Sequence, residues 1–375
     1  MMHHLVRELP PGYGGVERVA HVLASRLGGI AFYLRSSRFS HDPLNVNYDR
    51  LHVKTIAFGR FYLPFPSKEL LRLLLSKEPL VAHLPCPSIL FLITLSRIMN
   101  AERIIIIYWH SYISPRINFQ GYLENIYQFL ALKIGRFFPL IVTSPVLRDK
   151  LIKQGFNIKK IYLLPCSLPT DLEQSYLKIS QNRNHDKSRL GTLAVICRLD
   201  SYKRVDWLIK SFSETLAAKK LVVLGDGPNR TNLVDLANKL IRDDQKIDFY
   251  GRVDEITKVR VLSLADVLVL PADSSNEAFG IVQLEAMASG IPAIAYDFPN
   301  SGMYWVSKLP SSLWSGSPSE LSIYLQKLFT DKTIYSKACT EAIERYQVEF
   351  SISTWEKRLC LLLNDYPELN RLRLE

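Results

Sequence analysis

The 375-residue sequence is poor in features that define several common protein classes. Its five cysteines form no CxxC pair, so we expect neither a disulfide framework nor a zinc finger, and the thiols indicate a reduced cytoplasmic protein. The N-terminus has no apolar core of a signal peptide. The most apolar stretches, 88–99 and 103–109, are shorter than the ~20 residues that span a bilayer. The chain has no run of five or more lysines and arginines and no repeat, which argues against a nucleic-acid-binding tail.

The sequence does have a globular composition and an excess of positive charge. Hydrophobic residues make up 47% and charged residues 22%, and the length predicts two domains. Lysine and arginine number 47 against 36 acids, a net charge of +11 that favours anionic partners. We therefore expect either a basic cleft for phosphorylated substrates or a basic patch that faces a membrane, and no nucleic-acid partner.

Short apolar runs alternate with amphipathic stretches, which predicts βαβ units and parallel sheets with helices on both faces. In the second half the predicted strands are 193–197, 221–225, 247–251, 267–271 and 291–296. The helices predicted between them are 205–216, 230–241, 256–264 and 280–289. The first half is less regular, with strands predicted at 4–6, 53–58, 80–84, 104–109 and 140–143 and a helix at 16–27.

These patterns predict an α/β fold of two doubly wound domains. We place the N-terminal domain at 1–170, a polar interdomain linker at 171–190, the second domain at 191–348, and one amphipathic helix in 349–375 that ends near Pro367. In doubly wound sheets, ligands bind outside the carboxyl ends of the strands. The residues that directly follow each predicted strand are therefore the candidate site.

Two cations follow the first predicted strand of the second half. Arg198 and Lys203, in "RLDSYK", lie close to the start of the next helix, where they would hold a diphosphate; a solvated surface loop is the alternative. Gly225 and Gly227, in "GDGPN", permit a tight turn after the next strand. The pattern is not GxGxxG, so a nicotinamide cofactor is not expected.

Two acids lie on either side of Phe279 and Gly280. On a helix that begins there, Glu285 borders the apolar arc that packs on the sheet, where a carboxylate is costly without a partner. A ribose with paired hydroxyls would be such a partner, and a surface lysine is the alternative. Glu277, in the preceding loop, is expected to enter the cleft between the domains. Backbone amides at the helix start suit phosphate or sugar oxygens.

Two features of the first half also follow predicted strands. Gly14 and Gly15 precede the helix at 16–27, where residues without a Cβ let the backbone approach a ligand; an ordinary turn is the alternative. His110 directly follows the strand at 104–109 and is placed to reach into the cleft, although a lone histidine is more often structural.

Taken together, these segments resemble the retaining family-4 glycosyltransferases of the GT-B fold over nearly the whole chain. The resemblance rests on "PPGYGGVERVAHVLASRL", "YWHS", "ICRLDSYKRVDWLIKSF", "LVVLGDGP" and "EAFGIVQLEAMASGIPAIA", in family order, with Glu277 and Glu285 as the E-x7-E pair. It implies two Rossmann-like domains facing a central cleft, with the C-terminal helix crossing back to the N-domain. It also implies a hexosyltransferase that moves a sugar from a nucleotide-diphosphate sugar to a glycan or polyprenol- or lipid-linked acceptor, with retention of anomeric configuration.

The resemblance implies roles for the charged residues. Arg198 and Lys203 neutralise the donor diphosphate, Glu285 accepts the ribose hydroxyls, Glu277 faces the donor sugar, and His110 lies near the transferred sugar. The other residues implied in donor binding are Gly14 and Gly15 at the phosphates, Arg252 and Val253 at the base, and the backbone of Phe279, Gly280 and Ile281. The sequence has no Asp-x-Asp pair, so we expect no metal and no other cofactor.

Two other functions are compatible with these features: a GT-B nucleotide-sugar epimerase, and a non-catalytic nucleotide-sugar-binding partner subunit. A subunit without activity need not keep all four charged residues. On the acceptor side, residues 58–79 mix aromatics, leucines and cations. A helix there would rest on an anionic membrane, which would make a cytoplasmic protein peripheral at the cytosolic face, or it would pack on its own domain.

Overall fold

The chain divides into two compact units in the computed structural model. The first contains Met1–Cys166 and Trp355–Glu375, and the second contains Ser167–Thr354. The residues that the structure describes are 1–12, 14–36, 46–58, 61–114, 118–183, 190–309 and 316–365. The predicted helix end near Pro367 and most of the polar stretch at 181–189 lie outside them.

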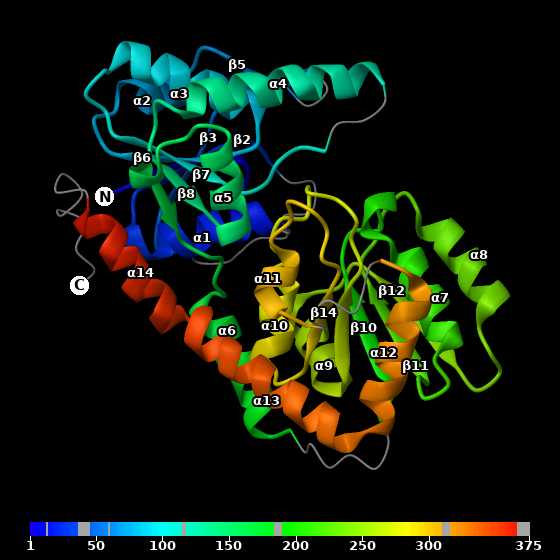
Figure 1. Ribbon diagram of the computed structural model, residues 1–375. Helices are drawn as coiled ribbons and strands as arrows, with labels where there is room; N and C mark the ends of the chain where they lie inside the picture. The colour runs from blue at the N-terminus through cyan, green and yellow to red at the C-terminus, as the bar shows by residue number, and fades with distance from the viewer. Residues whose placement is uncertain are drawn as a thin grey trace. The chain divides into compact units, whose positions relative to one another are not determined.

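The first unit is built on a parallel sheet of seven strands in the order β3-β2-β1-β6-β7-β8-β9 (Figure 1). The strands are β1 (His3–Glu8), β2 (Ile30–Arg35), β3 (Asp49–His52), β6 (Leu80–Leu84), β7 (Ile105–Trp109), β8 (Leu140–Val142) and β9 (Ile161–Leu163). A separate antiparallel hairpin joins β4 (Thr55–Phe58) to β5 (Phe61–Pro64). Its helices are α1 (Gly15–Leu27), α2 (Lys68–Leu75), α3 (Pro87–Met99), α4 (Phe119–Gly135) and α5 (Pro145–Lys153), with a 3₁₀ turn at Ile158–Lys160.

The second unit contains a parallel sheet of five strands in the order β12-β11-β10-β13-β14. The strands are β10 (Thr192–Ile196), β11 (Lys220–Leu224), β12 (Lys246–Gly251), β13 (Val267–Leu270) and β14 (Ala293–Ala295). Contacts join α7 (Val205–Glu214) to α8 (Arg230–Leu240) and α12 (Pro318–Thr330) as one layer. The opposite layer contains α6 (Thr170–Gln181), α9 (Glu255–Leu264), α10 (Val282–Ala288) and α13 (Lys332–Glu349), and α11 (Met303–Ser307) packs on β14.

In each sheet the chain reverses the direction in which it adds strands. In the second unit it proceeds from β10 outward to β11 and β12, then returns to the other side of β10 to form β13 and β14. In the first unit the reversal lies between β1 and β6. The two doubly wound arrangements confirm the predicted fold class, and each reversal is a point where ligands bind in such sheets.

Several segments differ from the sequence predictions. The predicted linker at 171–190 contains α6, because Tyr176 is buried and the buried Glu173 carboxylate accepts hydrogen bonds from Tyr346 Oη (2.7 Å) and from the backbone amide of Ile352 (2.8 Å). The strand predicted at 53–58 is found as β4, which pairs with β5 outside the main sheet. Neither β2 nor β9 is predicted from the sequence.

The last described helix, α14 (Ile352–Asn364), follows α13 after a short break. From Trp355 onward its residues belong to the first unit. There Arg26 of α1 forms an ion pair with Glu356 at 2.7 Å, and Trp355 and Leu359 are buried. Among the described residues, none of the helices has both the length and the apolar character to span a bilayer.

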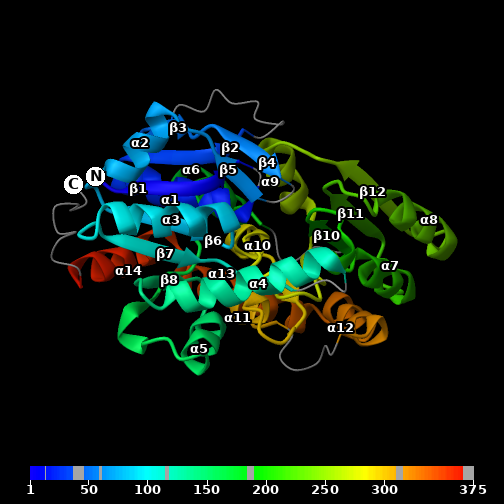
Figure 2. The same ribbon diagram turned by 90° about the horizontal axis from the view of Figure 1, so that it is seen from above.

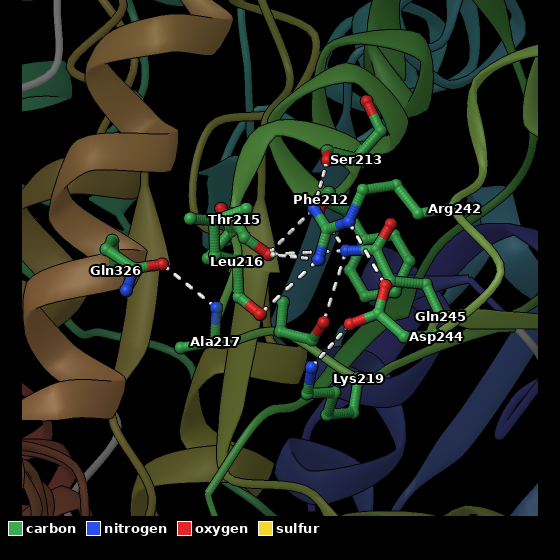
Figure 3. A network of polar contacts seen from close by, with 11 residues as sticks. Phe212, Ser213, Thr215, Leu216, Ala217, Lys219, Arg242, Asp244, Gln245 and Gln326 are labelled. Carbon is green, nitrogen blue, oxygen red and sulfur yellow. Dashed lines mark hydrogen bonds and ion pairs between the residues drawn. The ribbon is translucent and has the colours of Figure 1, made fainter.

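A polar network caps the C-terminal end of α7 (Figure 3). The buried Gln245 donates through Nε2 to the carbonyl oxygens of Phe212 (2.7 Å), Thr215 (3.2 Å) and Ala218 (3.1 Å). Arg242 donates to the carbonyl oxygen of Ser213 nearby. Helix ends leave carbonyl groups without intrahelical donors, so this loop supplies them and fixes the connection from α7 to β11.

Replacing Gln245 with alanine should therefore destabilise the second unit. Gln245→Ala removes the donor from three carbonyl oxygens, so we expect the free energy of unfolding to fall by about 1–3 kcal/mol. Asp243→Ala, an exposed change two residues away, is the control and should stay within about 0.5 kcal/mol of the wild type. Urea denaturation followed by circular dichroism measures both, and equal midpoints for the two variants would contradict the capping role.

Candidate functional site

The loops after β10 and β13 bring Lys203 and Glu277 together. These two strands are neighbours at the reversal point of the second sheet, and the Lys203 ammonium forms an ion pair with the Glu277 carboxylate. Lys203 ends the 3₁₀ turn Ser201–Lys203, and Glu277 lies in the loop before α10. The side chains are 10% and 18% exposed, so the pair is mostly buried yet reachable by a ligand. Of the predicted site residues, these two are in direct contact.

Arg204 fixes the loop that positions Lys203. Its backbone is left-handed at φ 48°, which ends the 3₁₀ turn and begins α7. Its guanidinium donates to Asp206 (3.1 and 3.0 Å) and to Asp273 (2.8 Å), and it stacks over the Trp207 ring at 3.8 Å. The contact to Asp273 joins the loops after β10 and β13 through side chains. The Lys203–Glu277 pair is thus held from both loops.

Burial shapes the electrostatics of this pair. Desolvation lowers the pKa of Lys203, and the nearby Cys197 and Asp200 oppose that effect. Desolvation also raises the pKa of the Cys197 thiol to about 11, so this thiol is neutral at physiological pH. A buried ammonium needs a nearby anion, and Glu277 is that anion here. A phosphate at the same place would satisfy the same requirement.

Glu285 lies fully buried on α10, as its position on the helix predicts. Its Oε1 is 2.7 Å from Nζ of Lys258, a buried lysine of α9 that also pairs with Glu255 at 2.7 Å. The sequence allowed a surface lysine as the alternative partner of Glu285. The partner found is a lysine, but a buried one. The carboxylate is held in one position by a charge from the neighbouring helix.

Other predicted donor residues lie on separate strand ends. The Arg198 side chain is 67% exposed and pairs with Asp200 at 3.3 Å. Arg252 is exposed and Val253 half-buried; both follow β12. Asp254 then caps α9 by accepting a hydrogen bond from the amide of Thr257 at 2.8 Å. Arg198 and Arg252 are thus in solvent at the carboxyl ends of β10 and β12.

The segment Phe279–Ile281 is rigidly placed at the start of α10. Gly280 has φ 74°, and a Cβ there would lie 2.4 Å from Leu270 Cδ2, so only glycine fits. Gln283 Nε2 donates to the carbonyl oxygen of Phe279 at 2.8 Å, and the Phe279 ring packs edge-on against Phe350. Ile281 is the N-cap residue, so α10 begins at Val282, two residues later than predicted.

Gly225 and Gly227 are explained by close packing of two loops. A Cβ on Gly225 would lie 1.8 Å from the carbonyl oxygen of Cys197, and one on Gly227 would lie 2.6 Å from that of Leu199. The loop after β11 therefore presses directly on the loop that contains Arg198 and Lys203. These glycines serve the turn, as the sequence predicts, and also support the cation loop.

In the first unit, His110 forms a buried histidine pair. His83, at the end of β6, and His110, after β7, share a hydrogen bond between Nδ1 and Nε2 at 2.9 Å. His110 also stacks on the Tyr108 ring with centroids 4.4 Å apart. Desolvation lowers the pKa of His110 to about 3, so the ring is neutral at physiological pH. His110 can thus offer a hydrogen bond but no charge.

The glycine pair Gly14–Gly15 has an explanation inside the first unit. A Cβ on Gly14, the N-cap of α1, would lie 2.0 Å from Oε2 of the buried Glu17. Glycine therefore lets the Glu17 side chain fold back over the helix start. Gly15, the first residue of α1, is exposed. The turn alternative accounts for Gly14, and a ligand role for Gly15 stays a prediction.

Sequence reasoning missed four residues that hold the site: Lys258, Arg204, Asp273 and His83. Lys258 lies 27 residues before Glu285, and no local pattern links a lysine on one helix to an acid on the next. Arg204 and Asp273 each follow a predicted strand, so the rule that led to Lys203 could have found them. His83 directly precedes the end of a predicted strand, as His110 directly follows one.

A cavity of about 640 Å³ lies beside the loop that contains Lys203. It is lined by Ser201, Tyr202, Arg204, Asp206, Lys210, Asn229, Asn232, Leu233, Leu236 and Asp273. None of the residues predicted for the donor site lines it. The Lys203–Glu277 pair therefore lies outside this cavity. It is the candidate site because of its ion pair and its position at the strand ends.

Part of the chain matches a known family. Residues 178–344 match the model of the glycosyl transferases group 1 family, a range that includes β10–β14 and the Lys203–Glu277 pair. Over this range, a little under half of its length, the chain is similar to the glycosyl transferases group 1 family. The predicted resemblance to glycosyltransferases is thereby confirmed.

Curated relatives match parts of the chain. An alpha-monoglucosyldiacylglycerol synthase of Streptococcus pneumoniae is 25% identical over 220 residues, 56% of this chain and 49% of that protein. A GDP-mannose-dependent monoacylated alpha-(1-6)-phosphatidylinositol monomannoside mannosyltransferase of Corynebacterium glutamicum is 31% identical over 129 residues, 31% of this chain and 33% of that protein. The chain thus matches half or less of the length of these relatives.

Solved structures confirm the fold of both units. Anabaena Alr3699/HepE, crystallised in complex with UDP, has a TM-score of 0.75 to this chain at 14% identity and covers 97% of this chain and 100% of its own. WaaG, a glycosyltransferase involved in lipopolysaccharide biosynthesis, has a TM-score of 0.66 at 15% identity and covers 96% and 99%. The predicted GT-B fold with two Rossmann-like units is therefore confirmed.

Removing Lys258 should lower the free energy of unfolding more than removing the charge of its partner Glu285. Lys258→Met leaves the acids of Glu285 and Glu255 without their shared cation, so we expect a loss of about 3–5 kcal/mol in the free energy of unfolding. Glu285→Gln leaves Lys258 paired with Glu255 and should cost clearly less.

The control for this pair is Lys239→Met, on the exposed face of α8, which should stay within about 0.5 kcal/mol of the wild type. Chemical denaturation of the three variants measures the differences. A loss for Lys258→Met no greater than that for Lys239→Met would show that the ion pair does not hold α9 to α10.

Proposed function

We propose that the protein is a retaining glycosyltransferase whose donor, a nucleotide-diphosphate sugar, binds at the carboxyl ends of β10 and β13. The observation that supports this proposal best is the Lys203–Glu277 pair at the reversal point of the second sheet. Ligands of doubly wound sheets bind there. A cation and an acid at one such point match two adjacent parts of the donor, its diphosphate and its sugar hydroxyls.

The comparisons support a nucleotide-sugar donor. The family match covers the unit that contains the pair. Anabaena Alr3699/HepE has been solved with UDP and glucose and with UDP-glucose. The Streptococcus relative is named for a glucosyldiacylglycerol and the Corynebacterium relative for a phosphatidylinositol mannoside, which supports the lipid-linked form of the predicted acceptor for this chain.

In the proposed reaction, breaking the bond between sugar and diphosphate places negative charge on the leaving phosphates. Lys203 lies where it can stabilise that charge, and its burial makes the interaction stronger than in water. The exposed Arg198 guanidinium, on the same loop, adds a second cation. Glu277, released from Lys203 when phosphate binds, is free to accept hydrogen bonds from the sugar hydroxyls.

Glu285 is proposed to accept the ribose hydroxyls. Lys258 makes this role reasonable, because a fully buried carboxylate needs a cation and the 2.7 Å contact also fixes its orientation. Arg252 and Val253, after β12, are proposed to border the base, and the backbone of Phe279–Ile281 to contact sugar and phosphates. His110 and Gly15 keep their predicted roles in the first unit, with His110 acting as a neutral hydrogen-bonding group.

The proposed transfer needs no metal, since Lys203 and Arg198 supply the positive charge that a divalent cation gives in other glycosyltransferases. Transfer to an acceptor separates this proposal from the two alternatives. An epimerase would convert the donor without acceptor, and a binding subunit would release no nucleotide in either condition.

Removing the Lys203 cation should slow transfer. With the donor first identified by a thermal-shift screen of nucleotide sugars, we expect Lys203→Ala to lower turnover by ~10²-fold or more, because the leaving phosphates lose their buried cation. Lys210→Ala removes an exposed cation from the adjacent α7 and should leave turnover within about twofold of the wild type. Nucleotide release with and without glycolipid vesicles is the measurement, and equal turnover in the two variants would reject the role of Lys203.

Transfer should also survive removal of divalent metals. After dialysis against excess EDTA, nucleotide release in the presence of acceptor is expected to equal that of the untreated protein. Loss of activity that returns on addition of Mg²⁺ or Mn²⁺ would show that the two cations do not replace a metal.

A further inference from the structure

Helix α4 has one face packed on the first unit and an apolar face open to solvent. The packed face is anchored by side chains: Tyr127 Oη accepts a hydrogen bond from the backbone amide of Cys86 at 2.8 Å, and Gln128 accepts one from that of Ile113 at 3.0 Å. Asn118 caps the helix by accepting from the amide of Gly121 at 2.9 Å. In Figure 2, α4 lies alongside α3, which it also contacts. The helix is therefore fully docked without using its other face.

The open face is unusually apolar. At about 100° per residue, its side chains fall in one arc of about 120°, roughly opposite the buried Ala131 and Gly135. The apolar members are between 40% and 75% exposed: Phe119, Tyr122, Leu123, Ile126, Phe129 and Leu130. Phe137, just beyond the helix, is 77% exposed. We call these seven residues the α4 stripe. Contiguous exposed apolar surface of this kind marks an interaction site.

Cations accompany the α4 stripe, and acids do not. Lys133 falls within the arc, with its ammonium 5.5 Å from the centre of the Phe129 ring, and Arg136 lies at its edge. The one acid of α4, Glu124, falls on the packed side. Aromatic and aliphatic side chains mixed with lysine and arginine are typical of helices that lie in the headgroup region of a membrane.

The positive charge of the chain is concentrated in the part that contains α4. Residues 1–166 contain 21 lysines and arginines against nine acids, a net charge of +12, whereas residues 167–375 contain 26 against 27, a net charge of −1. The excess of positive charge thus belongs to the part of the chain that contains α4. This distribution is complementary to an anionic lipid surface and adds attraction for each basic residue close to it.

We propose that the α4 stripe docks on the surface of an anionic phospholipid bilayer, with the helix parallel to the membrane plane. This places the membrane contact on α4, whereas the sequence pattern suggested residues 58–79, where α2 also exposes Leu71 and Leu75. The proposal concerns the first unit alone and does not depend on the donor site of the second.

The test is co-sedimentation of the full chain with vesicles. We expect binding to phosphatidylcholine vesicles rich in phosphatidylglycerol, weaker binding as salt is raised, and little binding to pure phosphatidylcholine. The double variant Phe129→Ser with Leu130→Ser should bind at least ~10-fold more weakly, because two apolar side chains no longer enter the bilayer.

A matched double variant provides the control. Ile256→Ser with Ile323→Ser removes two apolar side chains that are 80% and 69% exposed on helices of the second unit, and it should bind vesicles as the wild type does. Circular dichroism and size-exclusion chromatography of both variants show whether they are folded and monomeric. The proposal is overturned if the wild type ignores anionic vesicles, if the stripe variant still binds them fully, or if the stripe instead joins two copies into a dimer that its variant dissolves.

Discussion

The second unit buries lysine side chains, and its structure depends on carboxylates that neutralise their charge. The Lys203 side chain is only 10% exposed, and taking an ammonium out of water is tolerated only beside an anion. Glu277 provides that anion from the loop after β13, so the contact joins the two loops that flank the reversal point of the sheet. A ligand that brings its own negative charge can take the place of Glu277 at low cost. The same constraint that organises this pair is the physical basis of the proposal that a diphosphate binds beside Lys203.

The neighbouring ion pairs follow the same principle and make the site rigid. Arg204 joins α7 to the loop after β13 through Asp206 and Asp273, and Lys258 joins α9 to α10 through Glu285. The Arg204–Asp273 and Lys258–Glu285 pairs link elements whose paired residues lie 69 and 27 positions apart in the sequence. Functional groups held by packing and by such contacts keep their geometry, which electrostatic stabilisation of a transition state requires. Burial of charge, usually costly for stability, here orders the strand ends.

Much of the fold could be predicted because buried parallel strands have near-continuous apolar runs, as in β6, β7 and β10. Short strands such as β9 and the polar helix α6 lack that signal; α6 is helical because Tyr176 and Glu173 pack against residues near 350. For the site, the rule of strand ends located Lys203 and Glu277. It could not predict that Lys258 is the partner of Glu285, because the two residues are 27 positions apart and no periodic pattern links them.

The two units use their charge in different ways. In the second unit the acids and bases nearly balance, and buried lysines are paired within the fold, so positive charge acts locally on whatever binds at the strand ends. In the first unit the excess of cations has no matching acids in the sequence and acts on its surroundings. A buried charge recognises a small anion through contact, whereas an unbalanced surface charge attracts an extended anionic surface over a Debye length. The net charge of +11 for the whole chain thus arises from the first unit. It says little about the second unit, where the donor is proposed to bind.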